Sequence, residues 1–176
     1  MPSYSPSTMA RIGDLTNGLR VDTSNLAGAT YLLTGNTQTE IFNVYGRIKL
    51  HNLFGEVTVV FSNHACVLYY TFTSTTPVIG VQPISAVGAS MAQLAVGERI
   101  SWVGGAVATA VVLTATPGIS DINVTPHILG GVTSAGANNV GSIGILTATA
   151  SLTSGNVRFS CFYTPMSDGA YVTAAL

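Results

Sequence analysis

Alternating apolar and polar residues mark one stretch, residues 41–61, around which the rest of the chain is organised. In its first half, FNVYGRIKL, every second residue from position 42 to position 50 is apolar or Gly. A period of two places one row of side chains against a core and the other toward solvent or a partner. The alternation stops at His51–Asn52 and resumes over residues 57–61. We therefore predict two strands joined at this break.

The same alternation predicts further short strands. They are expected at residues 65–73, 98–103, 106–115, 140–152 and 157–163, with an irregular strand at 119–129 and a last short strand at Tyr171–Val172. Gly104–Gly105 is the signal of a two-residue hairpin. Residues 78–87 contain Pro83, which suits a sheet edge or a loop. Short strands separated by frequent turn signals are typical of all-β sandwiches and barrels.

One segment does not fit the strand pattern. In residues 88–96, GASMAQLAV, Met91 lies three and four positions before Leu94 and Ala95, and Ser90 can cap the start. This spacing predicts a short helical turn that ends at Gly97.

The fold expected from these elements is all-β: an antiparallel β-sandwich or barrel, jelly-roll-like, over residues 39–176. Residues 1–38 differ, because they hold two of the prolines and many Ser, Thr and Asn residues, and apolar residues are sparse before Tyr31. We predict that residues 1–38 form an extended N-terminal arm that orders against a neighbouring subunit or a host surface, with a frayed terminus as the alternative.

The chain has few charges. Six basic and seven acidic residues make up 7% of the sequence, against roughly a quarter in ordinary domains, and the mean hydropathy is +0.47. A soluble monomer of this composition is poorly protected against association. Every apolar run is too short for a spanning helix of ~18 residues, and a membrane barrel is expected to carry aromatic girdles that one Trp cannot supply. We therefore expect assembly with other chains and no membrane.

Candidate chemistry is sparse. A net charge of −1 with no basic cluster disfavours nucleic-acid binding. Cys66 and Cys161 lie in apolar strands and are expected to be buried free thiols, with a disulfide as the alternative. His51, His64 and Glu56 form the one conceivable metal set, but the spacing of a helix-borne site is absent. We expect no enzyme, no metal and no cofactor.

Glu56 lies in an otherwise apolar strand and needs a partner. Arg47, Lys49 and Arg99 are the available cations, and an ion pair that is buried or lies between subunits is the expected use of this carboxylate. The N-terminus lacks the basic start and apolar middle of a secretion signal, so we expect the protein to be made and assembled in a cytosol.

The C-terminal stretch SGNVRFSCFYTPMSDGAYVTAAL resembles small virion proteins of tailed bacteriophages. In that group an aromatic strand runs into Tyr-Thr-Pro, an Asp-Gly turn and a short Ala/Val tail. The matching positions are Tyr163, Thr164, Pro165, Asp168, Gly169, Tyr171 and Val172. The segment GRIKLHNLFGEVTVVF, from Gly46, is also similar to that group. The resemblance covers residues 40–176 and implies a structural protein without catalytic residues.

This resemblance, with the shortage of charges, predicts a capsid decoration (cement) protein. We expect a homotrimer that binds the major capsid protein on the phage head, in a virion assembled in the host cytoplasm. The candidate interface residues are Tyr31, Leu32, Leu33, Tyr45, Arg47, Glu56, Arg99 and Tyr171. The alternatives are another virion subunit, such as a major shell protein, or a tail or head fibre module that binds host-surface glycans. The fibre module would stack sugars on Tyr31, Tyr45, Tyr69 and Trp102.

Overall fold

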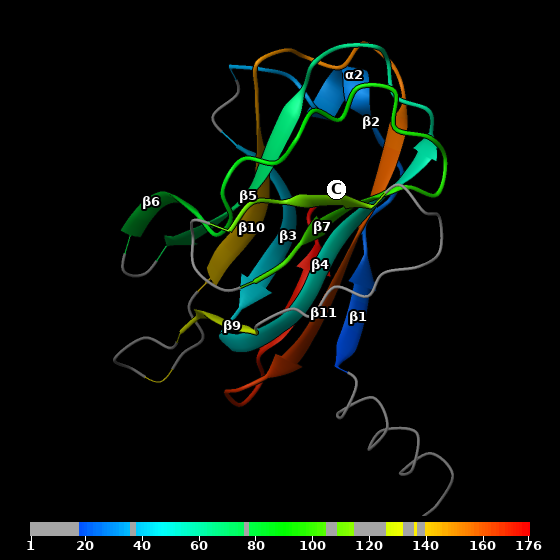
Figure 1. The fold of residues 1–176 in the computed structure, drawn as a ribbon. Coiled ribbons are helices and arrows are strands. Elements are labelled where there is room, and N and C mark those ends of the chain that lie inside the picture. The colour runs from blue at the N-terminus through cyan, green and yellow to red at the C-terminus, as the bar shows by residue number, and fades with distance from the viewer. Residues whose placement is uncertain are drawn as a thin grey trace, which may run out of the picture.

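The structure is a computed structural model that describes residues 18–35, 38–75, 78–104, 109–114, 126–131, 136 and 140–176. The described chain is nearly all β, as predicted, with one four-residue helix, α2, at Gly28–Tyr31. Its strands form two antiparallel sheets, which we call sheet A and sheet B (Figure 1).

Sheet A has the strand order β1-β11-β4-β7-β8, with β2 beside β11 and β9 beside β4. Its strands are β1 (Leu19–Asp22), β2 (Leu26–Ala27), β4 (Arg47–Val59), β7 (Arg99–Trp102), β8 (Val112–Thr114), β9 (His127–Gly130) and β11 (Asn156–Pro165). Sheet B has the order β12-β3-β10-β5-β6. Its strands are β3 (Thr39–Tyr45), β5 (Val67–Thr75), β6 (Val78–Pro83), β10 (Val140–Ala148) and β12 (Tyr171–Ala174).

The strand pairing is nested along the chain. β1 pairs with β11, β3 with β10, β4 with β7, and β5 with β6. These four pairs follow one another along a single long antiparallel ribbon, which ends in the β5–β6 hairpin. Pairing of β11 with β4 and of β10 with β5 then folds the ribbon into the two sheets.

Side chains from both sheets share one hydrophobic core, which gives a sandwich-like arrangement. Tyr70 of sheet B lies edge-to-face on Phe159 of sheet A, with ring centroids 6.2 Å apart. The Tyr70 hydroxyl donates a 2.7 Å hydrogen bond to the carbonyl of Ile100 in sheet A. In return, Nε1 of Trp102 donates to the carbonyl of Ile84, just after β6, at 2.9 Å. The buried polar atoms of both aromatic side chains therefore tie the layers together.

The strand end predicted at His51–Asn52 is wrong, because β4 continues through these two residues. β3 and β4 are separated by Gly46 alone, which has a φ of 75°, and they belong to different sheets. A left-handed residue turns the chain from one layer to the other, and Gly adopts that conformation without a Cβ clash. His51–Asn52 is instead a bulge inside β4, because the register with β11 shifts there. The shift moves the buried positions from even to odd numbers.

The other strong alternations are confirmed as strands. Residues 65–73, 98–103, 140–152 and 157–163 correspond to β5, β7, β10 and β11, the last short strand is β12, and residues 78–87 begin with the edge strand β6. The tight hairpin at Gly104–Gly105 is wrong. β7 and β8 pair antiparallel, but Ser101 is opposite Val112, so the connection is much longer than two residues. Most of the irregular strand predicted at 119–129 lies outside the described residues, apart from its end in β9.

The helical turn predicted at 88–96 is also wrong. The segment is irregular, with a left-handed Gln93 at φ 59°. Met91 and Leu94 are nevertheless buried, and the amide of Met91 donates to the carbonyl of Cys66 at 2.7 Å. The two apolar side chains reach the core from a loop held by tertiary hydrogen bonds, so their helical spacing was coincidental.

The described part of the predicted N-terminal arm is built into the domain. β1 and β2 pair with β11, and the amide of Gly28 donates to the carbonyl of Gly155 at 2.8 Å. Leu26 and Leu32 lie in the core. Residues 18–35 are therefore part of the folded body, and what remains of the predicted arm before residue 18 lies outside the described residues.

Candidate interaction surfaces

The Lys and Arg residues that the structure describes all lie on the outer face of sheet A. They are Arg20, Arg47, Lys49, Arg99 and Arg158. In β4 and β11 the residues between them are buried, so strand alternation points the charged side chains away from the core. Arg20 pairs with Phe162 of β11, and Arg99 pairs with Glu56 of β4, so both cations also face outward. Cations that are scattered in the sequence thus share one surface.

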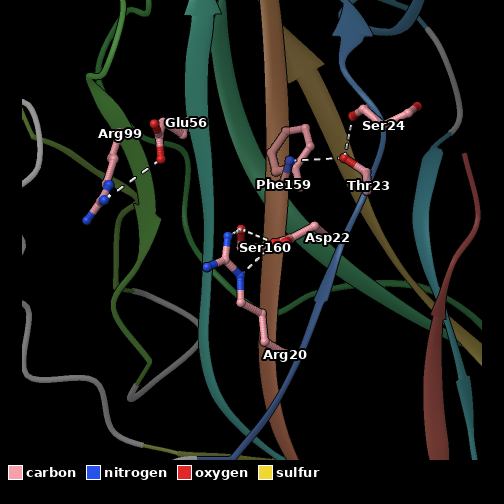
Figure 2. Close-up of polar contacts among 8 residues, drawn as sticks. All are labelled: Arg20, Asp22, Thr23, Ser24, Glu56, Arg99, Phe159 and Ser160. Atoms are coloured by element: carbon pink, nitrogen blue, oxygen red, sulfur yellow. Dashed lines mark hydrogen bonds and ion pairs between the residues drawn. The ribbon is translucent and has the colours of Figure 1, made fainter.

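Two of these cations have carboxylate partners on the same face (Figure 2). Nε of Arg20 lies 2.9 Å from Oδ1 of Asp22, which also accepts a 2.6 Å hydrogen bond from Ser160. Burial raises the pKa of Asp22, but the hydrogen bonds from Ser160 and Arg20 and the charges of Arg20 and Arg158 outweigh it, so the pKa lies below its usual value. Across the sheet, Nη2 of Arg99 lies 3.8 Å from Oε2 of Glu56.

Aromatic rings lie between these ion pairs. The Phe54 and Phe162 rings stack with centroids 6.1 Å apart, Arg99 lies 4.8 Å from the Phe54 centroid, and Arg20 lies 5.6 Å from that of Phe162. The rings are covered by cations of the same chain, and an exposed ion pair such as Arg20–Asp22 is worth only ~0–1 kcal/mol. Of the three cations predicted as possible partners of Glu56, Arg99 lies beside it, in a half-buried pair within one chain.

The outer face of sheet B, in contrast to that of sheet A, carries few charged residues. At one end of the sheet, one outward-facing residue from each strand forms a row that we call the apolar row: Tyr171, Tyr45, Val140, Thr75 and Val78. The two Tyr rings stack at 4.4 Å, and the Thr75 hydroxyl donates to the carbonyl of Val140 at 2.5 Å. Tyr171 is 46% exposed, Val140 38% and Val78 88%.

Charged residues are nearly absent from the strands of sheet B. Glu40 is the single charged residue in the five strands of sheet B, and residues 57–97 contain no Asp, Glu, Lys or Arg. Exposed apolar side chains that gather on one face are typical of interaction sites, which makes this row a candidate. The two outer faces of the molecule therefore offer different contacts to a partner.

The predicted interface residues are divided among three places. Tyr31, Leu32 and Leu33 lie at α2 and just after it, where Leu32 is fully buried and the Leu33 carbonyl accepts a hydrogen bond from Thr147. Tyr45 and Tyr171 belong to the apolar row, and Arg47, Glu56 and Arg99 lie on the outer face of sheet A. Sequence reasoning did not single out Val78 and Val140, because only the strand pairing places them in one row with Tyr45.

The residues considered for chemistry are not brought together. Nε2 of His51 lies 2.7 Å from the Thr164 hydroxyl, and burial, with the charge of Lys49, lowers the pKa of His51. His64 is exposed in the loop after β4. In the part of the chain that the structure describes, no group of three His, Cys, Asp or Glu side chains is arranged to hold a metal. No helix among the same residues is long and apolar enough to cross a membrane.

Both cysteines are free and buried, as predicted. Burial raises the pKa of Cys66 to about 11 and that of Cys161 further still. Both side chains are therefore neutral thiols near pH 7, and neither has the lowered pKa of a reactive cysteine. They act as small apolar core residues.

Comparisons with protein-family models, with curated proteins and with solved structures find no match for this chain.

Proposed function

We propose that this chain is a virion structural subunit, a decoration (cement) protein of a bacteriophage head that acts by burying apolar β-surface against other chains. The observation that carries the proposal is the apolar row on sheet B, together with the near absence of charged residues from the strands of that sheet. Each 1,000 Å² of apolar surface buried is worth roughly 25 kcal/mol before the costs of association are subtracted. Repeated over a shell, such contacts would resist outward pressure without any chemistry.

The nested strand pairing supports a jelly roll as the topology. In chain order, the strands β1, β3, β4, β5, β6, β7, β10 and β11 pair first with last, second with seventh, third with sixth and fourth with fifth. Rolling such a ribbon gives the two sheets of a jelly roll, an architecture found in viral capsid proteins and in lectins. Fold alone does not fix function, so the choice between these classes depends on the surface.

A particle-binding experiment tests the proposal. Purified chain is added to phage shells that lack it, and the bound protein and the melting temperature of the shells are measured. We expect saturable binding at many sites on the head and a higher melting temperature. The expected homotrimer, the partner capsid protein and the location on the head remain predictions. Absence from the head of purified particles, or binding without stabilisation, would contradict the proposal.

Glycan binding by a fibre module is the second candidate. The exposed and stacked Tyr45–Tyr171 pair favours it, because aromatic rings on a sheet face can pack against sugars. Trp102, one of the four aromatic residues expected to do this, is fully buried and hydrogen-bonded inside the core. A glycan array with the wild-type chain and with Tyr171→Ala separates the candidates. A fibre module would bind specific glycans and lose that binding in the variant.

A further inference from the structure

β6 is an edge strand that no other described strand covers. It pairs with β5 on one side and, among the described residues, has no strand on the other, and in Figure 1 it lies to the left of the body, beyond β5 and β10. All six of its residues are exposed, with Val78 at 88%, Ile79 at 43% and Val81 at 37%. An edge strand with apolar side chains presents unpaired backbone groups that can pair with another strand.

Proteins usually protect such edges, and β6 has few of the usual protections. Lys or inward-pointing charges are common devices, but β6 and β5 contain no charged residue. The register shift in the pairing with β5 and Pro83 at the end of the strand provide partial protection. A Cβ added at Gly80 would meet nothing within 4 Å. The face of the strand at Gly80 therefore has room for a side chain.

The edge strands β9 and β2 are shorter than β6, with four and two residues, and the other described sheet edges are also less suitable for pairing. β1 carries the Arg20–Asp22 ion pair. β12 is followed by Leu176, whose carbonyl accepts a hydrogen bond from the amide of Ser24 next to β1, at 3.5 Å. Just before β8, Ala110 forms a bridge with Ala86. Since β6 is uncharged and uncovered, the edge that matches it best on another copy of this chain is β6 itself.

We propose that β6 pairs antiparallel with β6 of a second copy about a two-fold axis, so that two five-stranded sheets join into one continuous sheet. This inference rests on the proposed function and names the contact between its subunits. Contact of identical surfaces is isologous and closes at a dimer. Val78 ends the apolar row, so the row of each copy would end at the new contact. The pairing predicts an even number of subunits, in place of the homotrimer expected from the sequence.

Lysine substitutions in β6 test the contact. Val81→Lys and Ile79→Lys each place a charge near its own symmetry mate, and sedimentation equilibrium of the full chain should show the dimer Kd rising on the order of tenfold or more. The matched control is Ile128→Lys, which changes a 61% exposed residue on β9 of sheet A and should leave the Kd unchanged. Circular dichroism checks that each variant remains folded.

A cysteine cross-link gives a second and direct measurement. Gly80→Cys places a thiol in the middle of β6, close to the proposed axis, and mild oxidation should yield a covalent dimer on a non-reducing gel. The control is Gly131→Cys, which also has open space around its Cβ but lies outside the strands and should stay monomeric on the gel. The native cysteines are buried and do not compete.

The outcomes separate this inference from the proposed function. A wild-type oligomer whose Kd does not respond to either lysine, and which is not cross-linked through Gly80→Cys, overturns β6 pairing but leaves the proposed function standing. A wild-type trimer would also overturn β6 pairing and leave the proposed function standing. A wild-type chain that stays monomeric at high concentration and does not bind shells overturns both.

Discussion

At the residue scale, single positions decide how the layers connect. Gly46 lies between a strand of sheet B and a strand of sheet A and has a φ of 75°. Its carbonyl also lies close to Gly130, where an added Cβ would be only 2.1 Å from that oxygen. The crossover therefore depends on a left-handed residue and on a neighbour without a side chain.

Gly46→Ala should destabilise the protein. Left-handed backbone costs a residue with a Cβ ~1–2 kcal/mol, so we expect the free energy of unfolding in urea to fall by that amount. Gly131→Ala is the control, because Gly131 is not left-handed and a Cβ there has open space. It should change the free energy by less than ~0.5 kcal/mol. Equal effects of the two substitutions would show that the backbone conformation of Gly46 does not matter.

Tyr70 should contribute through its hydroxyl as well as its ring. Tyr70→Phe removes the hydrogen bond that crosses from sheet B to the Ile100 carbonyl in sheet A, and we expect a loss of ~0.5–1.5 kcal/mol in the free energy of unfolding. The neighbouring Tyr69→Phe is the matched control, since that side chain is partly exposed on the opposite face. No difference between the two variants would mean that the cross-layer hydrogen bond adds nothing to stability.

At the element scale, the N-terminal segment behaves as core rather than as an arm. Leu32, next to α2, is fully buried among side chains of the main core. Leu32→Ala should therefore lower the free energy of unfolding by about 2–5 kcal/mol, measured by chemical denaturation. The control Thr30→Ala changes an exposed residue of the same helix and should have little effect. An arm that orders only against a partner would instead leave the isolated chain equally stable after Leu32→Ala.

Strand positions could be read from the sequence wherever one face is buried. In β11, the alternating residues Val157, Phe159, Cys161 and Tyr163 were predicted to share one face, and the structure buries all four. Which sheet each strand joins could not be read, because the switch at Gly46 depends on one dihedral angle. The helical turn predicted from Met91 and Leu94 was wrong, because loop residues that reach a core can have the same spacing as residues on one face of a helix. The described part of the arm was misjudged because its few apolar residues are enough to cover one end of the core.

The candidate surfaces were less predictable than the strands. Tyr45, Tyr171, Arg47 and Arg99 were predicted as interface residues, and they lie on two opposite faces. The apolar row depends on the register of five strands, and a shift of one residue would reverse which side chains face out. Sequence alone does not fix that register.

At the scale of the whole molecule, charge is separated between the two outer faces. The described cations lie over sheet A, whereas the strands of sheet B carry a single carboxylate, Glu40. An assembly that uses sheet A would be electrostatic, and one that uses sheet B would be apolar. The ionic-strength dependence of association distinguishes them.

Self-association of the wild-type chain should therefore be insensitive to salt. The screening length falls from ~10 Å at 0.1 M salt to ~3 Å at 1 M, which weakens contacts between exposed charges but not the burial of apolar surface. Sedimentation velocity at low and high sodium chloride should give the same Kd, and association should weaken on cooling, because the hydrophobic contribution declines at low temperature. A Kd that rises steeply with salt would place the contact on sheet A, among Arg20, Lys49 and Arg99, and would leave the apolar row facing solvent.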